Sequence, residues 1–236
     1  MYLYGFDSGY ILVLIAAVLS MIASAKVNTT YKKYSKKYTA RNITAERAAR
    51  SILDANGLHS VKIESVSGNL TDHYDPRANV IRLSDSVRNS TSVAAVGVAA
   101  HEAGHAVQHA VGYSPIKLRN ALVPVANIGS MAGPYLIIFG LLLSGASAFS
   151  NILVNVGIWF FAAAVLFQLV TLPVEFNASR RAITILSEEM YLESDEVPAV
   201  KKVLGAAAMT YVAAAAVSVA NLLRFIMLSN SRRRRD

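Results

Sequence analysis

The chain has 236 residues, of which 54% are hydrophobic and only 16% are charged, whereas a soluble domain carries roughly 25% charged residues. This composition excludes a disordered chain and a fibrous repeat, and it favours a protein that lies partly in lipid. The net charge of +8 is concentrated in residues 26–50 and 232–236, and because patches beside apolar runs are typical of membrane orientation signals, we expect no nucleic-acid partner.

The first apolar run, residues 10–25, is near the short limit for a helix that spans a membrane. Ala23-Ser24-Ala25 resembles a signal-peptidase site, but the segment before the run contains Asp7 and no basic residue. We therefore expect a retained anchor whose N-terminus lies outside. The positive-inside rule then places the lysine-rich stretch Lys26–Lys37 in the cytosol.

Residues from about 42 to 120 have the composition of a soluble domain. Residues 43–56 are predicted to form a helix with Thr44 as its N-cap and Gly57 as its terminator. A second, longer helix is predicted over residues 93–111, with N-cap residues before it.

Two short strands are predicted between these helices, over residues 59–65 and 79–84, because polar and apolar residues alternate there. Asp72 and Asp75 lie in a segment predicted to be a turn rather than a metal site. The strand at 79–84 would be an edge strand. It either pairs with an extended substrate or is structural only.

Two uncharged apolar runs, Ala121–Phe149 and Ile152–Leu172, predict a membrane hairpin that turns at Ser150–Asn151. A last apolar run, Val203–Leu228, contains Arg224. If this run also spans, the arginine-rich tail lies outside, against the positive-inside rule. We expect a fourth helix in contact with the membrane and leave the side of the tail open.

The motif that indicates chemistry is His101-Glu102-Ala103-Gly104-His105, an HExxH sequence inside the predicted helix. Histidines at i and i+4 share one helix face, where both imidazoles can reach one Zn²⁺. Glu102 lies one step round and can contact a water instead. The chain has no cysteine, so histidine and carboxylate must hold any metal. Two surface histidines are the alternative, which the apolar neighbours of the motif disfavour.

A catalytic zinc takes three protein ligands and a water. Between Ala121 and residue 185 the one carboxylate is Glu175, at the end of the predicted hairpin. An ionisable group at a membrane boundary is a candidate functional group. The alternative is an interfacial glutamate that pairs with Arg180 or Arg181. His109 continues the i+4 series, but its position favours a contact behind the ligands or with substrate.

HExxH followed by a membrane hairpin and a glutamate motif resembles the membrane-embedded gluzincin proteases, whose second motif runs Glu-x-x-Ala-Asp. The segment here is Glu175-Phe176-Asn177-Ala178-Ser179, in which serine replaces the aspartate. The chain is more similar to the YugP-like neutral zinc metallopeptidases of bacterial membranes, over residues from about 30 to 215. The segments that carry this resemblance are His73–Pro76, Ile81–Ser84, Gly97–His105 and Leu172–Phe176.

The resemblance implies a Zn²⁺ ion held by His101, His105 and Glu175. It also implies that Glu102 is the catalytic base, which takes a proton from a zinc-activated water and passes it to the leaving amine. Residues expected behind the ligands or beside the substrate are His73, His109, Asn177 and Ser179. The group that stabilises the oxyanion is left open among His73, Tyr74, His109 and Tyr191.

Together these features predict a mainly α membrane protein with three or four transmembrane helices and a small cytosolic α+β zincin-like domain that carries the HExxH helix. The predicted segments are the membrane anchor 1–25, the cytosolic metallopeptidase region 26–120, the transmembrane hairpin 121–174, the cytosolic segment 175–202 with the third zinc ligand, and the C-terminal hydrophobic helix and basic tail 203–236.

The expected function is that of a membrane-bound zinc metallopeptidase that hydrolyses membrane or membrane-proximal proteins. The expected location is the bacterial cytoplasmic membrane, with several spans and the active site on the cytosolic side. The expected partners are a protein or peptide substrate and the lipid bilayer; a homo-oligomer or a membrane partner protein stays open. Two alternatives are a catalytically inactive metal-binding membrane adaptor, which the intact Glu102 argues against, and a small-molecule membrane hydrolase.

Overall fold

The computed structural model describes residues 8–143, 148–188 and 191–233. The chain divides into two compact units. The helical unit comprises residues 1–23, 117–172 and 210–236, and the α+β unit comprises residues 24–116 and 173–209. Residues 1–7 of the predicted anchor and Arg234–Asp236 of the basic tail lie outside the described residues.

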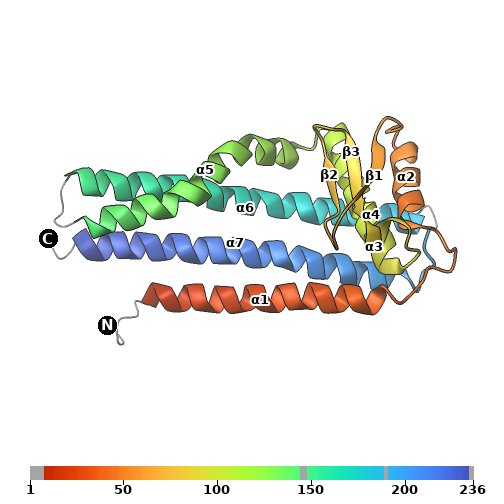
Figure 1. Cartoon of the computed structure of the whole chain (residues 1–236), viewed down its shortest axis with the longest axis horizontal. Helices are drawn as coiled ribbons and strands as arrows, with labels where there is room; N and C mark the ends of the chain where they lie inside the picture. Colours follow the sequence, from red (N-terminus) through yellow and green to blue (C-terminus); the bar gives the residue numbers. More distant parts are fainter. Residues whose placement is uncertain (1–7, 144–147, 189–190, 234–236) are drawn as a thin grey trace. The chain divides into compact units, whose positions relative to one another are not determined.

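Four long helices supply the helical unit and continue along the chain into the α+β unit (Figure 1). They are α1 (Ser8–Tyr34), α5 (Ser114–Leu142), α6 (Ala148–Glu188) and α7 (Val197–Arg233). Within the described ranges, these four are long and apolar enough to cross a membrane, with mean hydropathies from 1.6 to 2.2. Large apolar side chains such as Trp159 and Leu142, each 77% exposed, cover their surfaces. Lipid is the solvent that accommodates such a surface.

Helices α5 and α6 pack closely in the helical unit because glycines face each other. A Cβ atom at Gly129 would collide with the carbonyl oxygen of Phe160, and one at Gly133 would lie 3.0 Å from that of Gly157. Small residues at such spacing let two membrane helices approach each other.

The turn of the hairpin differs from the prediction. Helix α5 ends at Leu142 and α6 begins at Ala148, so Ser150 and Asn151 lie in the first turn of α6 instead of between the helices. The Ser150 hydroxyl is buried and donates to the carbonyl of Gly140 in the last turn of α5, at 2.9 Å. This hydrogen bond satisfies the buried hydroxyl of Ser150, a residue type that otherwise favours loops over helices.

The α+β unit contains α2 (Ala45–Ala55), β1 (Lys62–Val66), β2 (His73–Asp75), β3 (Val80–Ser84), α3 (Asp85–Arg88) and α4 (Val93–Ala110). The predicted caps are confirmed. Thr44 accepts a hydrogen bond from the Arg47 amide, and Ser92 accepts one from the Ala95 amide. Gly57 has a φ of +72°, the left-handed conformation that ends α2.

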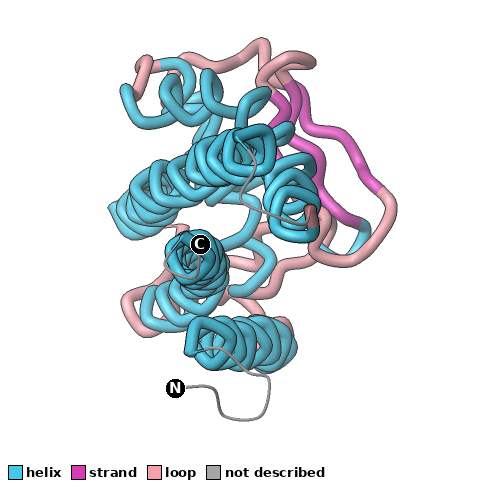
Figure 2. The backbone as a smooth tube through the Cα atoms, turned by 90° about the vertical axis from the view of Figure 1, so that its left-hand side faces the viewer, coloured by secondary structure: helices cyan, strands magenta, loops and turns pink. Residues whose placement is uncertain are grey.

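The three strands form one sheet in the order β1-β3-β2, seen in magenta in Figure 2. β1 pairs with β3 in parallel, and β2 pairs with β3 in antiparallel orientation. The prediction that residues 79–84 form an edge strand is therefore wrong, because β3 is the central strand. The residues predicted as a turn supply β2 at one edge.

Asp72 and Asp75 make hydrogen bonds that hold this part of the sheet together. Asp72 accepts hydrogen bonds from the amide and the hydroxyl of Ser84. Asp75 accepts from the backbone amides of Arg77 and Ala78 and pairs with Arg82 at 3.1 Å. Partial burial raises the pKa of Asp72, although the hydrogen bonds from Ser84 oppose this shift.

The core of the α+β unit joins segments that are distant in the sequence. Ile52 of α2, Leu83 of β3, Val96 of α4, Leu186 of α6 and Leu204 of α7 are members of one buried cluster. Helix α4 lies inside this core, and its buried residues are mostly alanine, valine and glycine. The HExxH segment is therefore held on a helix that is enclosed by packing.

Candidate metal centre

His101 and His105 lie one turn apart on α4, with ring centroids 4.6 Å apart and ring planes at 83°. Their side chains are 13% and 12% exposed, so each ring is largely enclosed but can be reached. The i and i+4 spacing thus brings two imidazoles to one small volume.

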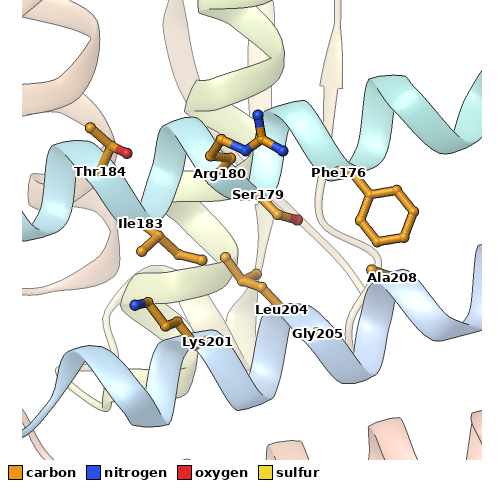
Figure 3. A pocket seen from close by; sticks show the side chains of 9 residues that line it. All are labelled: Phe176, Ser179, Arg180, Ile183, Thr184, Lys201, Leu204, Gly205 and Ala208. Atoms are coloured by element: carbon orange, nitrogen blue, oxygen red, sulfur yellow. The ribbon is translucent and has the colours of Figure 1, made fainter.

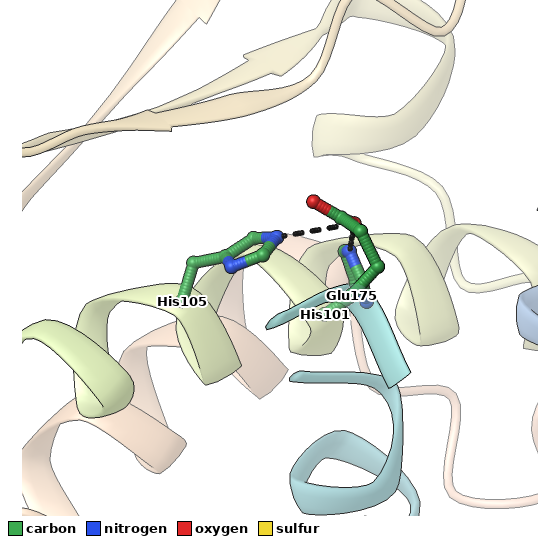
Figure 4. Close-up of side chains that lie close together, drawn as sticks. All are labelled: His101, His105 and Glu175. Atoms are coloured by element: carbon green, nitrogen blue, oxygen red, sulfur yellow. Dashed lines mark ion pairs between the residues drawn. The ribbon is translucent and has the colours of Figure 1, made fainter. Parts of the chain in front are cut away.

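Glu175 of α6 meets these two histidines (Figure 4). Its Oε2 atom lies 3.3 Å from Nε2 of His101 and 3.6 Å from Nε2 of His105. One ligand atom from each of the three residues lies within 4.8 Å of the others, so the cluster could hold a metal ion. Arg181, one of the cations considered as an interfacial partner of Glu175, donates to Asn177 instead.

Gly104 explains how α6 comes so close to α4. A Cβ atom at this position would lie 2.8 Å from the carbonyl oxygen of Ala178. Any side chain there would displace the backbone of α6, and with it Glu175. The glycine within the HExxH segment therefore has a packing role in placing the third side chain of the cluster.

Gln108 fixes the orientation of the His105 ring. Its Oε1 atom lies 3.0 Å from Nδ1 of His105, and its amide nitrogen donates to the Val174 carbonyl at 2.8 Å and to Oδ1 of Asn177 at 2.9 Å. Because an amide oxygen can only accept, Nδ1 of His105 must carry the proton. In the neutral ring, Nε2 then carries the lone pair, which is available to a metal.

Ser179 contacts His101 in the same way as Gln108 contacts His105, because its Oγ atom lies 3.1 Å from Nδ1 of His101. Both histidines thus use Nδ1 for a protein contact and direct Nε2 toward the shared point. Histidine ligands of zinc are held in this way, and two imidazoles with one carboxylate are a donor set that zinc accepts. The residues present therefore fit a zinc ion.

Glu102 is 8% exposed and lies beside His101 on α4. Within the described part of the chain, its side chain has no recorded hydrogen bond or ion pair, which leaves the carboxylate available to water.

Burial lowers the pKa of His105, but the hydrogen bond with Glu175 and the charges of Glu102 and Glu175 outweigh it, so this pKa is raised overall.

The remaining predicted site residues have different positions. Asn177 contacts Gln108 and Arg181 behind the cluster. His73 is exposed on β2, and its Nδ1 atom lies 2.8 Å from the Thr71 carbonyl. The ring of His109 packs edge-on against Tyr74 at 6.2 Å. Tyr191, the fourth candidate for stabilising an oxyanion, packs partly buried against the core.

Sequence reasoning missed Gln108, which is fully buried. Its signal was present, because it is a neutral polar residue in an apolar helix, three positions after His105. Such spacing places it on the same helix face one turn further on.

A largely enclosed cluster of two histidines and a glutamate that could hold a metal ion, together with four described helices long and apolar enough to cross a membrane, is typical of a membrane-associated metalloprotein. Residues 9–230 match the family described as "Putative neutral zinc metallopeptidase", and the chain belongs to that family. It is 48% identical to the "Putative membrane protease YugP" of Bacillus subtilis over 93% of this chain and 96% of the relative. No solved structure matches the chain.

Proposed function

We propose that this protein is a membrane-bound zinc metallopeptidase that hydrolyses peptide bonds in membrane or membrane-proximal proteins. The observation that carries the proposal is the orientation of the two histidine rings toward Glu175. Both Nε2 atoms lie within 3.6 Å of one Glu175 oxygen, while both Nδ1 atoms contact protein partners. The family and the name of the Bacillus subtilis relative support the same reaction class.

His101, His105 and Glu175 would hold the zinc ion. When bound, zinc supplies Lewis acidity, which polarises a scissile carbonyl and makes a water more acidic. Gln108 and Ser179 would keep the two imidazoles in the tautomer with the proton on Nδ1 and prevent the rings from rotating. The low exposure of the three side chains limits competing solvent.

Glu102 would act as the general base and then as the general acid. Its carboxylate accepts one proton of the attacking water as the oxygen of that water bonds to the peptide carbonyl carbon. It returns this proton to the amine nitrogen as the C–N bond breaks, which leaves a carboxylic acid and an amine. Its small exposed fraction and position next to His101 support this role.

The test is Glu102→Gln in the full-length protein, with Glu188→Gln as a matched control because Glu188 is an exposed residue. Each variant is incubated with bacterial membranes, and new protein N-termini are counted by mass spectrometry. We expect Glu102→Gln to keep its zinc and to lose cleavage by about 100-fold or more. Equal cleavage by wild type and Glu102→Gln would exclude the role of Glu102, and zinc-loaded wild type that produces no new N-termini would favour the adaptor.

We further propose that the protein crosses the bacterial cytoplasmic membrane several times and that its cluster faces the cytosol. The lysine-rich end of α1 supports this orientation, because basic residues that flank spans are retained inside. The absence of cysteine allows a direct test with Ser67→Cys, at an exposed turn of the α+β unit. A membrane-impermeant maleimide should label this variant only after the cells are opened. Labelling of intact cells would show that the α+β unit lies on the outer side of the membrane, opposite to the proposed orientation.

A further inference from the structure

A pocket of about 470 Å³ lies along the α6 and α7 segments of the α+β unit (Figure 3). Phe176 and Ser179 of α6 and Leu204 and Ala208 of α7 are among its lining residues. Gly205 also lines it, and a Cβ atom added there would have no atom within 4 Å. The pocket therefore has a mixed apolar and polar lining with open space above Gly205, in the size range of small-molecule sites.

Two cations, Arg180 and Lys201, border the pocket from opposite helices. Both are exposed, and among residues 8–143, 148–188 and 191–233 neither side chain has a recorded ion pair or hydrogen bond. None of the lining residues is acidic. The positive charge at this pocket is therefore not neutralised by the described part of the protein.

Ser179 adds a third donor. Its oxygen accepts the Nδ1 proton of His101 when that ring is in the tautomer that frees Nε2. A hydroxyl has one proton of its own besides its acceptor lone pairs, and Ser179 is one of the residues that line the pocket. Arginine, lysine and serine side chains on the lining of one pocket favour an anion with several oxygens.

We propose that this pocket binds the anionic headgroup of a bilayer phospholipid. Arg180 and Lys201 contact the phosphate, and Phe176, Leu204 and Ala208 contact the first part of the acyl chains. A free phosphate would use the cations alone, whereas a lipid also accounts for the apolar part of the lining. Along the chain, Phe176 and Ala208 lie next to the helical-unit boundaries at Leu172 and Thr210, where basic side chains are suited to headgroups.

The test uses the full-length protein in a neutral detergent and short-chain phosphatidylglycerol, with phosphatidylcholine of the same chain length as the zwitterionic comparison, which has no net charge. Binding is measured by native mass spectrometry. Lys201→Gln is compared with Lys202→Gln, which removes the same charge from the next residue, outside the lining. We expect phosphatidylglycerol to bind about tenfold more weakly to Lys201→Gln and to Arg180→Gln. Lys202→Gln should bind like wild type.

Gly205→Leu tests the pocket itself without removing a charge. The open space above Gly205 accommodates the new side chain, so the protein should keep its melting temperature but bind phosphatidylglycerol about tenfold more weakly. Gly205→Ala should leave binding unchanged. Equal lipid binding by all variants would overturn the proposal. So would inorganic phosphate that binds as tightly as the lipid, or a peptide with a free C-terminal carboxylate that binds more tightly.

Discussion

The Nδ1 atom of His105 lies 3.0 Å from the Oε1 atom of Gln108, one turn further along the same helix. The amide group of Gln108 donates to the carbonyl of Val174, the residue before Glu175. One buried side chain thus orients one proposed zinc ligand and holds the backbone beside another. Gln108 therefore links α4 to α6 directly beside the proposed zinc ligands.

Replacing Gln108 with methionine should therefore weaken zinc binding by about 10- to 100-fold, the usual effect of losing a hydrogen-bond partner of a ligand. Methionine has a similar volume, so the core should remain filled. Zinc affinity is measured by competition with a chelator. Gln108→Glu is the comparison, because it keeps an acceptor for the His105 proton and should lose less affinity. Unchanged affinity in a folded Gln108→Met variant would contradict the role of Gln108.

Ser179→Ala should weaken zinc binding by up to about tenfold, because the Nδ1–H of His101 loses its acceptor. The expected loss is smaller than at Gln108, since Ser179 makes a single recorded contact with the ring. Ser179→Thr keeps the hydroxyl and should retain most of the affinity. The same competition titration checks both variants, and a threonine variant as weak as the alanine one would show that packing, not the hydroxyl, matters.

Gly104→Ala should destabilise the α+β unit by about 1–3 kcal/mol, as overpacking of a filled core does. The added Cβ atom would meet the Ala178 carbonyl at 2.8 Å and push α6 away from the histidines. Gly205→Ala is the matched control, because it changes a helical glycine in open space and should be neutral or stabilising by up to about 1 kcal/mol. Chemical unfolding measures both. Equal stability of the two variants would show that α4 and α6 can move apart at Gly104 without a loss of stability.

Removal of zinc by a chelator should lower the melting temperature of the protein by several degrees, because a ligand that binds only the folded state stabilises it. His105→Gln should melt at the same temperature with and without the chelator. Differential scanning fluorimetry in detergent provides the comparison. A wild-type transition that does not respond to the chelator would mean that zinc is not held by the folded chain.

Much of the fold was predictable because local chemistry determines it. Thr44 and Ser92 are N-caps whose side-chain oxygens accept backbone amides, and Gly57 takes the left-handed conformation that ends α2. Glu175 could be selected because it is the one carboxylate in a long uncharged region. These features depend on a few neighbouring residues or on composition.

Other features depend on contacts between distant segments, so the sequence did not reveal them. Strand β2 has three residues and exists because β3 offers it a free edge. The Ser150 hydroxyl is satisfied by Gly140 of the preceding helix, which lets α6 begin earlier than the polar residues suggest. The role of Gln108 needs the carbonyl of Val174, 66 residues away in sequence.

The most direct test of a zinc centre in this protein is the zinc content of the purified full-length chain, measured for wild type, Glu175→Gln and the control Glu188→Gln. Both variants remove one carboxylate from α6, but only Glu175 lies beside the two histidines. We predict about one zinc ion per chain for wild type and for Glu188→Gln, and a loss of most of it for Glu175→Gln. Equal zinc content in all three proteins would contradict the assignment of Glu175 as the third ligand.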